Sequence, residues 1–272
     1  MSQKNVLTLF LCAFPWPTGP HADALLDHAP LPPGYVRIAA APGSFAAWLR
    51  DLPMKPGHPP VLLFNGAPKA NQHAHVAVFD VDVGAADLQQ CADAVMRLRA
   101  EFQWSRHDDA HIHFALTSGD DAPWARWRDG ERPLIVKDKR RQEHVHWVPR
   151  EDSDASYPNF RRYLDLVFLY AGSASLEGML QKKAREPVEV GDVFIQGGHP
   201  GHAVIVVDVA EKKGERVFLL AQSYMPAQNI QLLANPADPA LSPWYRAVPD
   251  EDLRTPEWIF HKGALRRFPE AQ

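Results

Sequence analysis

The sequence predicts an α+β fold in which an antiparallel sheet packs against a central helix. Two long segments carry apolar residues at steps of three and four, which is typical of amphipathic helices. Residues 190–224, "VGDVFIQGGHPGHAVIVVDVAEKKGERVFLLAQSY", contain apolar strands, the last two joined by a charged hairpin. Of the 272 residues, 46% are hydrophobic and 23% are charged, a balance that supports a sizeable core. Helices mixed with short antiparallel strands indicate the α+β class.

The amino-terminal half predicts one short helix, two strands and one long helix. "GSFAAWLRDLPM" has Ser44 as a helix cap, and "PVLLFNG" and "HAHVAVFDVDVG" are typical of strands. "DLQQCADAVMRLRAEF" is the clearest helix of the chain. Asp87 and Gln90 fit a capping box, so we expect this helix to begin at Asp87, with Cys91 in its first turn.

The carboxy-terminal half adds a second long helix between groups of strands. "AHIHFALTSG", "PLIVKD" and "HVHWVP" predict strands, and "DDAPWARWRDGER" predicts a loop or short helix. The second helix is expected at about Pro158 to Ala171, with Gly172 ending it. One further strand is expected at Trp258 to His261.

The first thirty residues resemble a leader, and residues 31–272 are expected to form a single α+β domain. "MSQKNVLTLFLCAF" has a lysine followed by a short apolar stretch, and Ala22-Asp23-Ala24 is similar to a signal peptidase site. A proline-rich, extended segment surrounds that site. This outline predicts a periplasmic or secreted protein; without a cleaved leader, the alternative is a cytoplasmic one.

Charge and cysteine content exclude several classes of protein. The net charge of −4 is spread along the chain without an extended basic face, so we expect no nucleic-acid partner. No apolar run approaches the roughly 20 residues of a membrane-spanning helix. Cys12 and Cys91 are the only cysteines, which leaves no disulfide framework and no cysteine-based zinc site.

One set of residues has the order required for nucleophilic catalysis by a thiol. Cys91 stands at the start of a helix, His202 opens an apolar strand, and Gln222 lies late in the next strand. A helix amino terminus lowers the pKa of a thiol, an imidazole can accept its proton, and a polar third group holds the imidazole in one orientation. The inert alternative is that Cys91 is a small core residue and His202 a structural histidine.

The segments "GDVFIQ", "GHAVIVVDV" and "ERVFLLAQSY", with Gln90-Cys91, resemble the CHAP and NlpC-type cysteine amidases and peptidases. The resemblance implies a papain-like fold, no cofactor, no metal, and cleavage of amide bonds in cell-wall peptides. It makes Cys91 the nucleophile, His202 the base and Gln222 the orienting residue. The residues it implies for the substrate or the oxyanion are Gln90, Ser223 and Asp192. The chain departs from the pattern at Ala221, where an acidic residue is expected, and in its longer interval between cysteine and histidine.

Over its whole length the chain resembles an uncharacterised bacterial family, the domain of unknown function 4846. The segments "GSFAAWLRDLP", "DLQQCADAVMRLRAEF", "GDVFIQGGHPGHAVIVVDVAE", "LLAQSYMPAQ" and "LSPWY" carry this likeness. It implies no established activity, and it favours an exported or lipid-anchored protein.

Two other functions stay open. Histidines spaced i, i+2 on strands place both rings on one face, which is a zinc-ligand arrangement; the pairs are His73 with His75, His111 with His113, and His144 with His146. Alternatively, tryptophans line a groove that binds peptidoglycan, a glycan or a peptide without catalysis. The tryptophans considered for this groove are Trp104, Trp124, Trp127, Trp147 and Trp244.

Overall fold

The computed structural model describes residues 25–139, 143–183, 187–246 and 251–269. The expected leader apolar stretch, Cys12 and the Ala22-Asp23-Ala24 site therefore lie outside the described residues. Within the described part, α1 (Leu25–His28) begins the fold, and Leu25 and Ala29 are fully buried. Leu25 and Ala29 thus pack with the domain, and the expected boundary at residue 30 stays a prediction. No helix of the described residues combines the length and apolar character needed to cross a bilayer.

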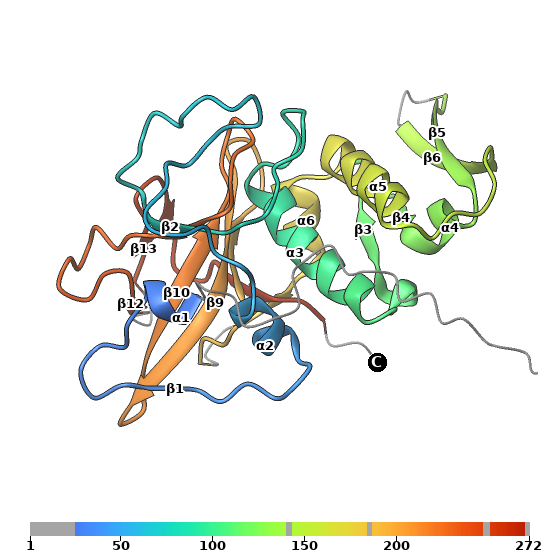
Figure 1. Ribbon diagram of the computed structural model, residues 1–272. Helices are drawn as coiled ribbons and strands as arrows, with labels where there is room; N and C mark the ends of the chain where they lie inside the picture. The colour runs from blue at the N-terminus through green and yellow to red at the C-terminus, as the bar shows by residue number, and fades with distance from the viewer. Residues whose placement is uncertain (1–24, 140–142, 184–186, 247–250, 270–272) are drawn as a thin grey trace, which may run out of the picture.

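A large antiparallel sheet is the centre of the fold, as the α+β class predicts (Figure 1). Among the described residues it has nine strands, and β9 and β10 are the longest. The order along the sheet is β2 (His75–Val78), β11 (Gln231–Leu233), β10 (Glu215–Gln222), β9 (His202–Lys212), β8 (Val193–Gln196), β15 (Leu265–Arg267) and β7 (Gln181–Lys182). β1 (Val36–Arg37) also pairs with β9, and β12 (Tyr245–Arg246) with β10.

Helices and three separate hairpins surround this sheet. The further helices are α2 (Phe45–Arg50), α3 (Cys91–Ser105), the 3-10 turn Asp109–His111, α4 (Trp124–Arg128), α5 (Tyr157–Tyr170) and α6 (Ser173–Met179). The hairpins are β3 (His113–Ala115) with β4 (Asp121–Pro123), β5 (Glu131–Lys137) with β6 (Glu143–Pro149), and β13 (Leu253–Arg254) with β14 (Ile259–Phe260). In Figure 1, α3 lies between the sheet and the part of the chain that contains α4, α5 and the β5–β6 hairpin.

β9 is buried on both of its faces, which explains its nearly continuous apolar sequence. Ala203, Ile205 and Val207 face one hydrophobic cluster, which includes the apolar residues of α3. Val204 and Val206 face a second cluster, which includes Phe260 of the β13–β14 hairpin. The sheet is therefore covered by helices on one side and by the carboxy-terminal segments on the other.

The long helix α3 begins at Cys91, four residues later than predicted. Gln90 is its N-cap, and the Gln90 backbone N–H donates to Oδ2 of Asp93 at 2.9 Å. Asp87 instead accepts hydrogen bonds from the Gln90 side chain at 3.1 Å and from the Ala227 backbone N–H at 2.6 Å. This later start places Cys91 at the first helical position, where its backbone N–H lacks an intrahelical partner.

Two further helices and one hairpin are confirmed, and one predicted strand is absent from the described residues. The α2 helix has the predicted Ser44 cap, whose hydroxyl accepts the Ala47 backbone N–H at 3.2 Å. The α5 helix and the strands of the β5–β6 hairpin lie close to their predicted positions. The "PVLLFNG" segment forms isolated bridges at Leu62 and Leu63 in place of a regular strand.

Candidate functional site

The Cys91 sulfur lies at the point where α3 meets the start of β9. The backbone N–H groups of Cys91, Ala92 and Ala203 lie close enough to this sulfur to lower the pKa of the thiol. Two of these donors belong to the first turn of α3, and the third belongs to the residue that follows His202 in β9. The structure therefore places the sulfur next to the peptide bond that joins His202 to Ala203.

The thiol of Cys91 is protonated at neutral pH in this environment. Burial raises the pKa of Cys91 to about 11, and the nearby Asp93 adds to the rise, whereas the three backbone N–H groups lower the pKa by a smaller amount. The side chain is only 8% exposed. The expected lowering of this pKa by the helix amino terminus is thus outweighed by loss of contact with water.

His202 and Gln222 interact directly at the end of the sheet. The His202 Nε2 atom lies 2.8 Å from the Oε1 atom of Gln222. The imidazole is also surrounded by aromatic rings, with centroids at 4.9 Å for Tyr224, 5.3 Å for Trp258 and 5.7 Å for Phe260. Burial lowers the pKa of His202 to about 4, because a ring that is 1% exposed loses the hydration of its charged form.

Tyr224 is a neighbour of both candidate catalytic groups. Its ring meets the His202 ring edge to face. Burial, Glu257 and Cys91 raise the pKa of the Tyr224 phenol, so its hydroxyl is within electrostatic reach of the thiol. Sequence reasoning missed Tyr224, although it lies two residues after Gln222, the last residue of β10.

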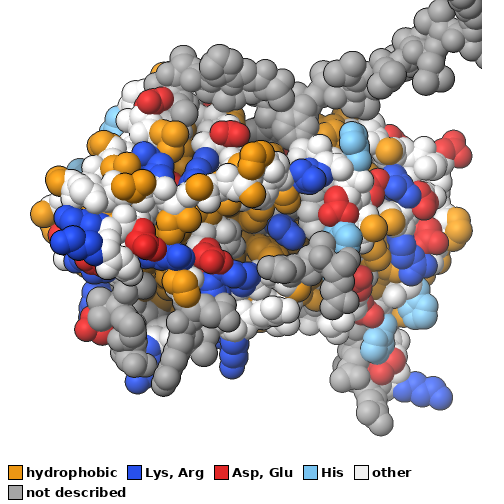
Figure 2. Space-filling model, turned by 90° about the horizontal axis from the view of Figure 1, so that it is seen from below, with side chains coloured by type: hydrophobic (Ala, Val, Ile, Leu, Met, Phe, Trp, Pro, Cys, Tyr) orange, Lys and Arg blue, Asp and Glu red, His pale blue; other side chains and the backbone are white. Residues whose placement is uncertain are grey.

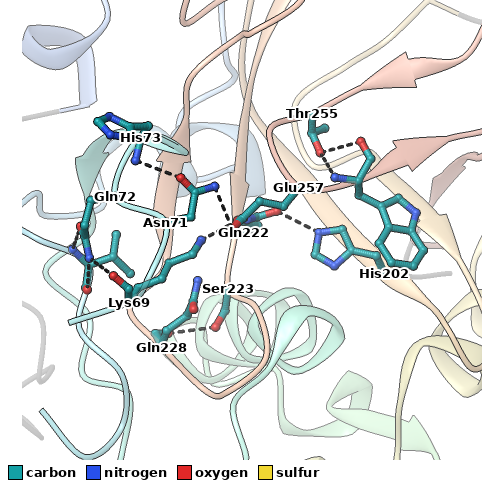
Figure 3. Close-up of polar contacts among 12 residues, drawn as sticks. Lys69, Asn71, Gln72, His73, His202, Gln222, Ser223, Gln228, Thr255 and Glu257 are labelled. Atoms are coloured by element: carbon teal, nitrogen blue, oxygen red, sulfur yellow. Dashed lines mark hydrogen bonds and ion pairs between the residues drawn. The ribbon is translucent and has the colours of Figure 1, made fainter. Parts of the chain in front are cut away.

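Two charged residues extend the polar network beyond Gln222 (Figure 3). The Gln222 Nε2 atom donates to Oε2 of Glu257 at 2.7 Å, and the Lys69 ammonium donates to the same oxygen at 2.5 Å. Asn71 donates to the other Glu257 oxygen at 3.3 Å. Sequence reasoning missed these residues because Lys69 and Glu257 lie in irregular segments far from the strands that they contact.

A family model matches residues 25–267 and is described as Domain of unknown function (4846). The chain belongs to this family. Cys91, His202, Gln222 and Glu257 all lie in the matched part of this family member. Searches of curated proteins and of solved structures found no match to it.

Three of the predicted site residues contact residues other than Cys91 and His202. The Gln90 side chain is turned toward Asp87. The Ser223 hydroxyl donates to the backbone carbonyls of Gln89, at 3.0 Å, and Gln228, at 2.9 Å, and so links the end of β10 to the segment before α3. Asp192 contacts Lys183 and Arg267 instead.

Asp192 lies at the opposite end of β8 from the candidate site. The last residue of β8, Gln196, pairs with His202, whereas Asp192 precedes the first residue of that strand. It accepts hydrogen bonds from Lys183 and Arg267, both at 2.8 Å, and is fully buried. A strand rises about 3.3 Å per residue, so Asp192 is separated from the site by the length of β8 and stabilises the fold there.

The alternative sites suggested by histidines and tryptophans do not assemble in the described residues. There, no group of three or more histidine, cysteine, aspartate or glutamate side chains is placed to hold a metal ion. His75 stacks on His58 at 4.6 Å and lies 3.0 Å from the Pro59 carbonyl, and His113 lies 2.9 Å from Asp121. Four of the five tryptophans expected in a groove are core residues: Trp104, Trp124, Trp127 and Trp244.

The surface carries charges of both signs. On the face shown in Figure 2, lysine and arginine side chains alternate with aspartate and glutamate, and hydrophobic side chains are scattered among them. The ion pairs of the described residues include Arg126 with Glu131 and Arg128 with Asp109. This face therefore has no extended region of one sign.

Proposed function

We propose that this chain is a cysteine hydrolase that cleaves amide bonds, with Cys91 as nucleophile and His202 as base. One observation carries the proposal. The Cys91 sulfur lies beside the His202–Ala203 peptide, while the His202 ring is held by Gln222 at 2.8 Å. Cys91 and the His202–Gln222 pair thus lie near the same end of the sheet, and their order along the chain is the one that thiol catalysis needs.

The reaction follows from these groups. His202 accepts the thiol proton as the sulfur of Cys91 attacks the amide carbon, and the carbonyl oxygen gains the negative charge. The backbone N–H of Cys91, which has no partner within the helix, then donates a hydrogen bond to that oxygen. The imidazolium then protonates the leaving nitrogen, the carbon–nitrogen bond breaks, and an acyl-thioester forms on Cys91. Water, deprotonated by His202, attacks this thioester, and the acid product and the thiol are released.

The two groups are neutral in the closed site, and this determines the type of catalysis. Burial raises the pKa of Cys91 to about 11 and lowers the pKa of His202 to about 4. A thiolate and imidazolium pair is therefore not formed before substrate binds. We expect proton transfer to accompany the attack, so that His202 acts as a general base.

The substrate class and the location of the protein come from the motif likeness. The "GDVFIQ", "GHAVIVVDV" and Gln90-Cys91 segments resemble cell-wall amidases of the CHAP and NlpC type. We therefore propose a papain-like core, export from the cytoplasm, and peptide amide bonds of peptidoglycan as the substrate. Fractionation of cells that express the full chain tests export, and its recovery in the cytoplasm alone contradicts it.

The test of catalysis is release of amino groups from purified peptidoglycan. We expect the wild-type chain to release them, and Cys91→Ala and His202→Ala to release none. Cys12→Ala is the matched control, because it removes the other thiol. Equal release by wild type and Cys91→Ala would refute the proposal.

Binding without catalysis is the second candidate, and burial of the thiol favours it. Cys91 is 8% exposed and His202 is 1% exposed, which is unusual for groups that react with a large substrate. If wild type and Cys91→Ala both sediment with insoluble peptidoglycan and neither releases fragments, the chain is a binding protein.

A further inference from the structure

Four polar side chains form a continuous chain of interactions that ends at the candidate base (Figure 3). His202 Nε2 lies 2.8 Å from Gln222 Oε1, Gln222 Nε2 lies 2.7 Å from Glu257 Oε2, and that oxygen lies 2.5 Å from Lys69 Nζ. We propose that Glu257 is a positioning residue that orients the Gln222 amide and thereby makes Nδ1 the basic nitrogen of His202. The effect of Glu257 on catalysis rests on the proposed function.

The direction of each hydrogen bond follows from the carboxylate. An ionised carboxylate can only accept hydrogen bonds, and Glu257 meets donors from Lys69, Asn71 and Gln222. Gln222 must therefore present its NH₂ group to Glu257, which turns its carbonyl oxygen toward His202. Since a carbonyl also only accepts, the proton of the neutral imidazole is on Nε2, and Nδ1 keeps its lone pair.

Without Glu257, the two orientations of the Gln222 amide would be similar in energy, because the acceptor of its NH₂ group would be gone. A carboxamide has a donor end and an acceptor end of nearly the same shape. If it rotated, its NH₂ group would donate to Nε2 of His202, and the ring proton would move to Nδ1. The imidazole would then lack a free Nδ1 to accept the thiol proton.

The Lys69 side chain supplies the countercharge that a nearly buried carboxylate needs. The side chains of Lys69 and Glu257 are 6% and 12% exposed, so the pair is shielded from water. The loop that carries Lys69 is held by Gln72, whose amide binds Val61 N at 3.0 Å, Val61 O at 2.9 Å and Lys69 O at 2.8 Å. These hydrogen bonds hold the backbone of Lys69 in the position from which its side chain reaches Glu257.

The hairpin that carries Glu257 also forms a wall of the site. The Thr255 hydroxyl donates to the Trp258 carbonyl at 3.0 Å and accepts the Trp258 N–H at 3.1 Å, which closes a tight turn around Glu257. Trp258 packs against the His202 ring. One turn therefore orients the amide behind His202 and covers the imidazole itself.

Nitrogen NMR of the full chain labelled with ¹⁵N-histidine tests the proposal without any need for activity. The signals of His202 are those lost in His202→Gln. We expect wild type at neutral pH to show a single tautomer with the proton on Nε2. In Glu257→Gln, residue 257 can donate as well as accept, so both tautomers should appear and any hydrolysis should fall by about tenfold or more.

Matched variants separate this effect from a general loss of structure. Glu251→Gln removes an exposed carboxylate shortly before the same hairpin and should leave the single tautomer unchanged. Lys69→Met should also produce both tautomers, because it removes the ammonium that holds Glu257 Oε2 beside the Gln222 amide. This variant serves if Glu257→Gln does not fold.

A proton on Nδ1 of His202 in the wild type would overturn the proposal. An unchanged Nε2 tautomer in folded Glu257→Gln would also overturn it. The proposed function can fail separately, because a chain that cleaves no peptidoglycan would still show the tautomer change.

Discussion

The reactivity of Cys91 toward iodoacetamide is the sharpest test of the described environment. Only the thiolate reacts, and burial raises the pKa of Cys91 from the ordinary 9.0 to about 11. At pH 7 this shift lowers the thiolate fraction by about 100-fold relative to an ordinary thiol. The low exposure of the side chain slows the reaction further.

The assay follows alkylation by mass spectrometry in a Cys12→Ser background, in which Cys91 is the single thiol. We expect the rate for the native protein at pH 7 to be at least about 100-fold below that for the same protein unfolded in urea. From pH 7 to 10 the native rate should rise about tenfold per pH unit without levelling, because the pKa lies above this range.

The neighbouring Asp93 provides an internal check on this reasoning. Asp93 is the second cause of the raised thiol pKa, after burial. Asp93→Asn should therefore shift the alkylation profile of Cys91 toward lower pH. A native rate at pH 7 equal to the unfolded rate, or a profile that levels at or below pH 9, would refute burial as the dominant effect.

Three further predictions concern stability. Burial lowers the pKa of His202 from 6.5 to about 4, so its neutral ring stabilises the fold above pH 6.5, and about 3 kcal/mol is lost as the pH falls toward 4. The check is the difference in urea unfolding free energy between wild type and His202→Gln from pH 7 to 4; a flat difference contradicts it. Gln222→Leu leaves the ring N–H of His202 without a partner and should cost about 1–3 kcal/mol in urea unfolding at pH 7; no measurable cost would be the contrary result. Asp208→Asn removes the buried carboxylate that binds Arg37 and Arg50, both at 2.7 Å, and should cost about 3 kcal/mol; an unchanged thermal midpoint would count against this pairing.

The elements that sequence reasoning predicted best are those with a long, regular period. α3 and α5 have apolar residues at helical spacing, and β9 and β10 form one long hairpin. The predicted start of α3 was wrong. Asp87 and Gln90 fit the capping-box pattern, but Gln90 is itself the N-cap, and its backbone N–H donates to Asp93. The helix α6 was missed because its seven residues are too few for a clear period.

The candidate site was predictable only in part. Cys91 and His202 stand at element ends, and Gln222 lies in the strand paired with the one that His202 opens, so their order was visible in the sequence. Gln90, Ser223 and Asp192 were also chosen from their motifs, yet their side chains contact other parts of the fold. Motif position alone does not determine where a side chain points.

Apolar periodicity was enough to predict the α+β class, the long helix and the strand pair, because it is a local property that the chain carries before it folds. The burial that keeps the Cys91 thiol protonated, and the contact of Glu257 with Gln222, arise only in the folded chain. Both depend on segments far apart in the chain. Desolvation and hydrogen-bond direction are set by what surrounds a group in space, and no local pattern encodes those surroundings.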